Sequence, residues 1–87
     1  MKFNEPKLYK DIYEVFKNED YMDMLDYSYY DDQASLDLYD VGWLGEDVFF
    51  KKLERYVNKL KQLGYSMKVF KFYDEGKGAE ARIRFYF

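Results

Sequence analysis

The residues of this chain that could do chemistry are carboxylates, and they gather in the middle of the sequence. Between Asn18 and Phe50 there are ten of the 17 acidic residues and no lysine or arginine. Tyrosines are interleaved with these acids. Carboxylates in this pattern could bind a divalent cation, exchange protons in catalysis, or present negative charge to a basic partner.

The first two of these uses find little support in the rest of the sequence. Histidine, the commonest general base and transition-metal ligand, is absent, and so is cysteine. The acid pairs Asp31–Asp32 and Asp37–Asp40 lack the spacing of a calcium-binding loop. No glycine-rich phosphate loop, nucleophile elbow or zinc signature occurs. We therefore expect no enzymatic activity, no bound metal and no cofactor.

Recognition of a basic protein is the use that the acidic run favours. A hairpin presents alternate side chains about 6.7 Å apart on one face, a spacing comparable with that of phosphates along a nucleic acid. Tyrosine and tryptophan are frequent interface anchors. The plainer alternative is a solvated acidic face that keeps a small protein soluble. The predicted partner-binding residues are Asp20, Asp23, Asp26, Tyr27, Tyr29, Tyr30, Asp31, Asp32, Asp37, Tyr39, Asp40 and Trp43.

Trp43 lies in the segment Gly42-Trp43-Leu44-Gly45, which the glycines mark as a loop. Two interpretations of this single tryptophan are open. It either plugs the junction between the two halves of the chain or stands exposed as an interface anchor.

Basic residues dominate the chain after the acidic run. From residue 51 to the end there are ten basic residues and four acids. Arg82 and Arg84 share a predicted strand face with Tyr86, and three further cations recur at helical spacing, namely Lys51, Arg55 and Lys59. Such residues could bind nucleic acid, or could form a solvated face that pairs with the chain's own acids. The sequence pI of about 4.9 argues against a dedicated nucleic-acid binder, and we expect the chain not to bind nucleic acid directly.

The acidic and basic residues are expected to lie on two successive units, each a helix followed by a β-hairpin. Apolar residues at helical spacing predict helices over 5–17 and 46–63, the second ended by Gly64. Alternating apolar and polar residues predict strands over 21–30, 36–39, 65–73 and 80–87, with turns at 31–35 and 74–78.

The predicted fold class is therefore α+β in αββαββ order, a four-stranded antiparallel sheet with two helices packed on one face. We expect the opposite face to be partly open, because Lys68, Lys71, Arg82 and Arg84 cannot all face one core. At 87 residues the chain is predicted to form a single compact domain, 1–87. Aromatic side chains, 23% of all residues, compensate for the small size of its core.

The sequence contains no run of about 18 apolar residues that would span a membrane. Its start, Met-Lys-Phe-Asn-Glu-Pro, lacks the apolar segment of a signal peptide. We therefore expect a cytoplasmic protein without membrane contact, which would act in the host cell cytoplasm if a phage encodes it. A monomer or a homodimer is expected.

A short, acidic, tyrosine-rich domain without histidine resembles many phage-encoded inhibitors, including anti-CRISPR and anti-restriction proteins. The resemblance lies in composition and not in a motif. Together with the charge pattern it implies a non-enzymatic inhibitor that mimics nucleic acid and binds the basic surface of its target. Three alternatives stay open: an immunity protein or antitoxin against a basic nuclease toxin, a small RNA- or DNA-binding module using Lys51, Arg55 and Lys59, and a homo-oligomer whose acidic and basic halves meet.

Overall fold

The computed structural model describes residues 5–17, 25–30, 33–40 and 42–87, and it describes side chains in 7–17, 33–40 and 42–87. Two helices and four strands lie in these ranges. Their order is α1 (Glu5–Phe16), β1 (Leu25–Tyr30), β2 (Gln33–Tyr39), α2 (Glu46–Gln62), β3 (Ser66–Asp74) and β4 (Gly78–Tyr86).

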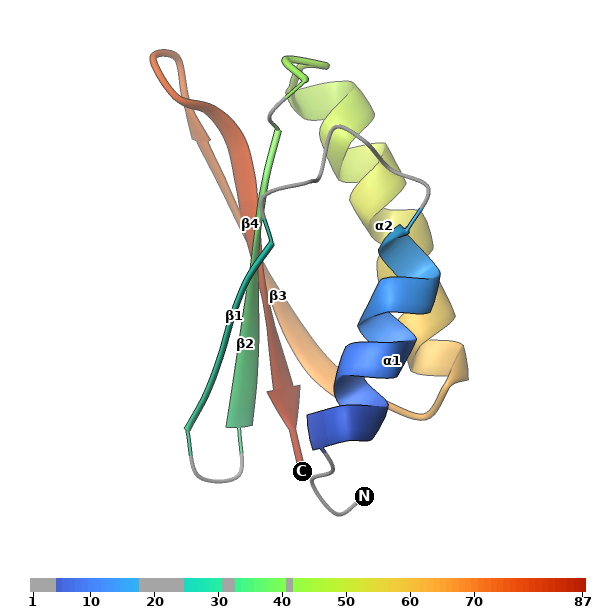
Figure 1. The fold of residues 1–87 in the computed structure, drawn as a ribbon. Coiled ribbons are helices and arrows are strands. Elements are labelled where there is room, and N and C mark those ends of the chain that lie inside the picture. Colours follow the sequence, from blue (N-terminus) through green and yellow to red (C-terminus); the bar gives the residue numbers. More distant parts are fainter. Residues whose placement is uncertain (1–4, 18–24, 31–32, 41) are drawn as a thin grey trace.

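The strands form one sheet in the order β1-β2-β4-β3, and every neighbouring pair is antiparallel. Strand β4 therefore joins the two halves of the chain, because it pairs with β2 on one side and with β3 on the other. Both helices lie on the same side of the sheet (Figure 1), and α2 packs against α1, β3 and β4. The predicted α+β class, with two helices and an antiparallel sheet, is confirmed.

The core lies between the helices and one face of the sheet. It is built from apolar residues at the expected periods of 3.6 on the helices and 2 on the strands. Phe16 of α1 and Tyr56 of α2 meet with ring centroids 4.7 Å apart. The largest fully buried side chains are Phe49, Phe85, Leu8, Leu36, Leu38, Leu53, Leu60 and Ile83.

The ends of α2 follow ordinary helix chemistry. Glu46 and Asp47 lie in its first turn and Lys59 and Lys61 in its last, which suits the helix dipole at both ends. Gly64 follows with a φ of 97°, a left-handed conformation that glycine adopts without steric cost. The prediction of a glycine C-cap at this position is confirmed.

The hairpin turns differ from their predicted bounds. Ala34 and Ser35, predicted to lie in a turn, belong to β2, which begins at Gln33. Ala34 is small and gives little strand signal, yet it is buried opposite Phe85 in the register of β2 and β4. Gly78, also predicted in a turn, begins β4. Of the predicted strand over 21–30, the part over 21–24 lies outside the described residues.

Neither of the described helices combines the length and the apolarity that crossing a bilayer requires. Within the same described ranges, no three acidic side chains gather in a way that could hold a metal ion.

Candidate functional site

The face of the sheet turned away from the helices carries the polar side chains of the strands. On β4, buried residues alternate with more exposed ones, so that Glu80, Arg82, Arg84 and Tyr86 lie opposite the core. The register then places two sets of neighbours beside β4 on this open face: Asp37 and Tyr39 of β2 on one side, and Lys68, Phe70 and Phe72 of β3 on the other. The prediction that Arg82 and Arg84 share a strand face with Tyr86 agrees with this arrangement.

The acidic and basic segments of the sequence are also separated in the folded chain, because of the strand order. Strands β1 and β2 both lie in the run without lysine or arginine. They occupy one edge of the sheet, whereas β4 and β3 occupy the other. Helix α2, which carries five lysines and arginines, packs over β3 and β4. The molecule therefore has an acidic edge at β1–β2 and a basic half formed by α2, β3 and β4.

Asp37 and Arg82 pair where the two halves meet. They are opposite in the register of β2 and β4. Arg82 Nε donates to Asp37 Oδ1 at 2.7 Å and Arg82 Nη2 donates to Asp37 Oδ2 at 3.4 Å. The hydrogen bond to Asp37 raises the pKa of the Arg82 guanidinium above its usual value. Such a partly exposed pair contributes only about 0–1 kcal/mol to stability.

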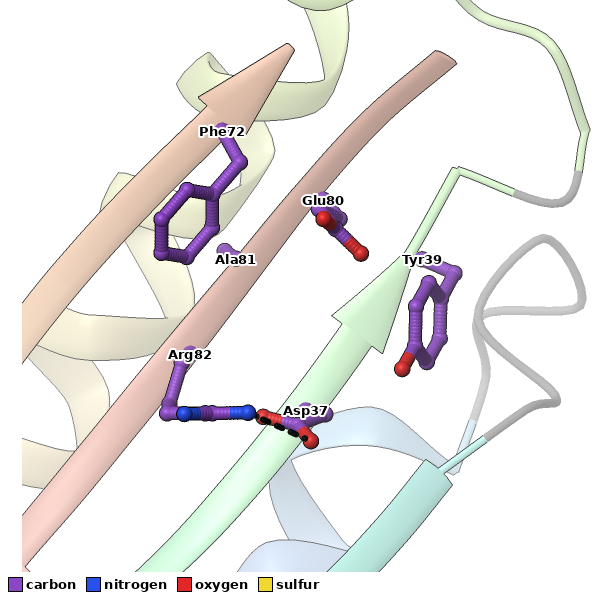
Figure 2. Close-up of a pocket in the computed structure, with 6 residues that line it drawn as sticks. All are labelled: Asp37, Tyr39, Phe72, Glu80, Ala81 and Arg82. Atoms are coloured by element: carbon purple, nitrogen blue, oxygen red, sulfur yellow. Dashed lines mark hydrogen bonds and ion pairs between the residues drawn. The ribbon is translucent and has the colours of Figure 1, made fainter. Parts of the chain in front are cut away.

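A shallow hollow of about 140 Å³ adjoins this pair on the open face. Figure 2 shows its lining residues, with the ring of Phe72 on one side of β4 and that of Tyr39 on the other, and with Glu80 between them. The hollow is open to solvent and presents charge and aromatic surface. It does not enclose a buried carboxylate of the kind that general acid–base catalysis uses.

Asp40 differs from the prediction that grouped it with surface acids. Its side chain is only 5% exposed. Its Oδ1 accepts a hydrogen bond from the Leu44 amide at 2.9 Å, and its Oδ2 accepts one from the Gly45 amide at 3.0 Å. The carboxylate thus orders the loop before α2, and Asp40 is not part of the candidate surface.

Trp43 is exposed, which decides between its two predicted interpretations. Its side chain is 67% exposed, and its φ of 52° is rare for a residue other than glycine. One side of the indole rests on Gly78, where an added Cβ would lie 3.3 Å from the ring. Trp43 is therefore not a plug between the halves of the chain.

The remaining predicted site residues lie either outside the described residues or in β1, for which the backbone is described. Asp20, Asp23, Asp31 and Asp32 lie outside the described residues. Asp26, Tyr27, Tyr29 and Tyr30 belong to β1, whose backbone pairs with β2. Asp26 is opposite Asp37 in this register, so two acidic positions are neighbours at the acidic edge.

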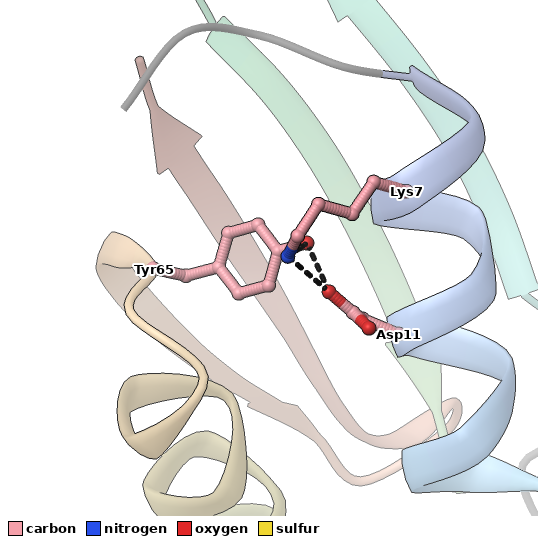
Figure 3. Close-up of polar contacts among 3 residues, drawn as sticks. All are labelled: Lys7, Asp11 and Tyr65. Atoms are coloured by element: carbon pink, nitrogen blue, oxygen red, sulfur yellow. Dashed lines mark hydrogen bonds and ion pairs between the residues drawn. The ribbon is translucent and has the colours of Figure 1, made fainter.

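Sequence patterns did not reveal a polar cluster that ties α1 to the start of β3. Tyr65 Oη donates to Asp11 Oδ2, and Lys7 Nζ donates to the same oxygen at 2.8 Å (Figure 3). Burial, and then the hydrogen bond to Asp11, raises the pKa of Tyr65. Burial alone would raise the pKa of Asp11, but the two donated hydrogen bonds outweigh it and lower that pKa. The partners are distant in sequence, so no local spacing could have indicated them.

Comparison of the chain with protein-family models, with curated proteins and with solved structures finds no match.

Proposed function

We propose that this protein is a non-enzymatic inhibitor that binds the basic, nucleic-acid-binding surface of a target protein through its acidic edge. The observation that supports this proposal is the strand order β1-β2-β4-β3, which sets the hairpin without lysine or arginine at one border of the sheet. A partner approaching that border meets acidic and tyrosine-rich sequence, and the basic residues of β3 and β4 lie beyond β2.

Charged contacts and aromatic contacts would both contribute to binding. Opposite charge accelerates encounter and selects basic partners, whereas buried aromatic anchors slow dissociation. The acidic edge combines both, because its acids alternate with tyrosines along the chain. Occupation of the target's basic surface would exclude nucleic acid from it.

The biological form that we propose is a phage-encoded anti-defence protein of the anti-CRISPR or anti-restriction type, acting in the host cytoplasm. An immunity protein or antitoxin against a basic nuclease would use the same contacts. Gene neighbourhood separates the two forms, since a phage early region supports the first and an adjacent toxin gene supports the second.

The decisive experiment compares two double variants of equal net charge. Asp26→Lys with Asp37→Lys, the edge variant, reverses charge at two neighbouring acidic positions of β1 and β2, whereas Glu54→Lys with Glu75→Lys reverses two exposed acids of the basic half. The tagged wild-type protein is used to capture its partner from the native or a related host, and the captured protein is identified. We expect the edge variant to lose at least about tenfold in affinity for it, and the control to lose little. Equal affinity of both folded variants would contradict the proposal.

The salt dependence of binding tests the same mechanism. Raising the salt from about 0.01 M to 0.15 M shortens the Debye length from about 30 Å to 8 Å, so the association rate should fall. The dissociation rate should change less, and truncation of Tyr39 to Ala should raise it, once the stability of that variant has been checked. An association rate insensitive to salt would indicate that the acidic run serves solubility only.

A further inference from the structure

Two cations on the open face lie side by side. Lys68 of β3 and Arg84 of β4 are directly opposite in the register. Neither forms an ion pair with any acid in the described part of the chain. Both lie over the same ring, with Lys68 Nζ 5.4 Å and Arg84 Cζ 5.3 Å from the centroid of Phe70.

The positive charges of Lys68 and Arg84 are not compensated by a described acid. Like charges directly opposite each other on a sheet repel and are destabilising. Arg82, two residues away on the same strand, has its charge compensated, because it forms an ion pair with Asp37. The ring of Phe70 relieves only part of the repulsion, since a cation–π contact at an exposed site is weak. An anion bound between Lys68 and Arg84 would offset the repulsion between these two cations.

Exposed aromatic rings lie on the same face on either side of the two cations, Tyr86 in the next row of the register and Phe72 two rows away, opposite Glu80. Tyr86 lies two residues beyond Arg84 on β4 and is 36% exposed. Phe72 lies two residues beyond Phe70 on β3 and is 47% exposed. Cations that can bind phosphates, interleaved with rings on which bases can stack, are the two components of surfaces that bind single-stranded nucleic acid.

We propose that the β3–β4 part of the open face binds single-stranded nucleic acid, with Lys68 and Arg84 on phosphates and Phe72 and Tyr86 stacked on bases. An acidic peptide would satisfy the two charges but would leave the rings exposed. This proposal departs from the expectation, based on the overall pI, that the chain binds no nucleic acid. The strand order provides the reason, because β1 and β2, the two strands of the acidic run, lie on the side of β4 that is away from β3.

The proposed site is also distinct from the helical stripe of Lys51, Arg55 and Lys59. That stripe belongs to α2, and α2 lies on the other side of the sheet from the open face (Figure 1). Substitutions in the open-face site should therefore weaken nucleic-acid binding, whereas substitutions in the helical stripe should not. The site is independent of the proposed function, which uses the acidic edge.

The test measures fluorescence anisotropy of a labelled oligothymidine of about 12 nucleotides with the full chain, starting near 0.05 M salt. Two phosphate contacts to a single strand predict a slope of log affinity against log salt of about −1.4, and K68Q or R84Q should each reduce its size by about 0.7. F72A should weaken binding roughly 5- to 150-fold, the loss expected for one stacked base. The matched control, K51Q with K59Q, should leave the affinity unchanged.

Three results would overturn the proposal. These are a loss of affinity in the helix control as large as that in K68Q, equally tight binding of a polyglutamate peptide, and no binding of the oligonucleotide near 0.05 M salt. Circular dichroism checks the fold of each variant, and amide chemical shifts of the wild-type protein locate the contact without any substitution. The acidic-edge variant should retain the oligonucleotide, so failure of this site and failure of the proposed function are distinguishable.

Discussion

Two of the acids predicted to bind a partner, Asp37 and Asp40, have side chains that the structure describes, and we expect Asp40 to contribute more to stability. In Asp40→Ala the amides of Leu44 and Gly45 both lose their acceptor, a carboxylate that is buried beneath an exposed loop. A hydrogen bond to a charged group is worth about 1.5–3 kcal/mol, and an unsatisfied buried donor costs a similar amount. Allowing water to reach part of the loop, we expect a loss of about 2–4 kcal/mol.

Asp37→Ala provides the matched comparison. It removes a carboxylate of the same chemistry, three residues earlier, whose partner is the partly exposed guanidinium of Arg82. We expect a loss of about 0–1 kcal/mol. Asp40→Asn should lie between the two, because its amide retains one acceptor oxygen for two donors.

Urea denaturation followed by circular dichroism measures all three variants, with the m-value checked for constancy. In thermal unfolding, the loss in Asp40→Ala corresponds to a fall in Tm of at least about 8 °C for a domain of this size. The reasoning would be refuted if Asp40→Ala unfolded within about 0.5 kcal/mol of the wild type, or if it lost no more stability than Asp37→Ala.

Two further predictions concern contacts that join distant parts of the chain. The pKa of Asp11 is lower in the folded state than in the unfolded state, so its stabilising contribution is present above about pH 4 and is lost as the pH falls through the folded value. Stability measured against pH should therefore fall more steeply in the wild type than in Asp11→Asn, and parallel curves would contradict this. Gly78→Ala should cost about 1–2 kcal/mol, because Gly78 has a φ of 86° and the new Cβ would meet the Trp43 ring. Thermal unfolding measures that cost, and a shift in Trp43 emission would accompany it.

The elements of this fold were predictable where the apolar period was strong. Helix α2 and strand β4 repeat buried residues without interruption, and Gly64 ends the helix as its position indicated. The start of β2 was not predictable, because Ala34 is too small to mark a strand and is buried only through its pairing with Phe85. Bounds that depend on a neighbouring strand cannot be obtained from a local pattern.

The candidate site was predictable in its charge but not in its contacts. The acidic run was visible in the sequence, yet Asp37 and Asp40 looked equivalent there. One faces an arginine on the next strand and the other accepts two loop amides, and only the folded chain distinguishes them. The pairing of Lys68 with Arg84 likewise depends on the register of β3 and β4.

The strand order also explains why the chain's opposite charges do not simply neutralise each other. Side chains on a sheet reach only the adjacent strands, so the acids of β2 can pair with the bases of β4, as Asp37 does with Arg82. Strands β1 and β3 are separated by β2 and β4, a distance of about 14 Å at the usual strand spacing. That distance exceeds the Debye length of about 8 Å at physiological salt. Charges on β1 and on β3 are thus largely screened from each other, so the two outer strands would present opposite signs to a partner even though the net charge of the chain is only −3.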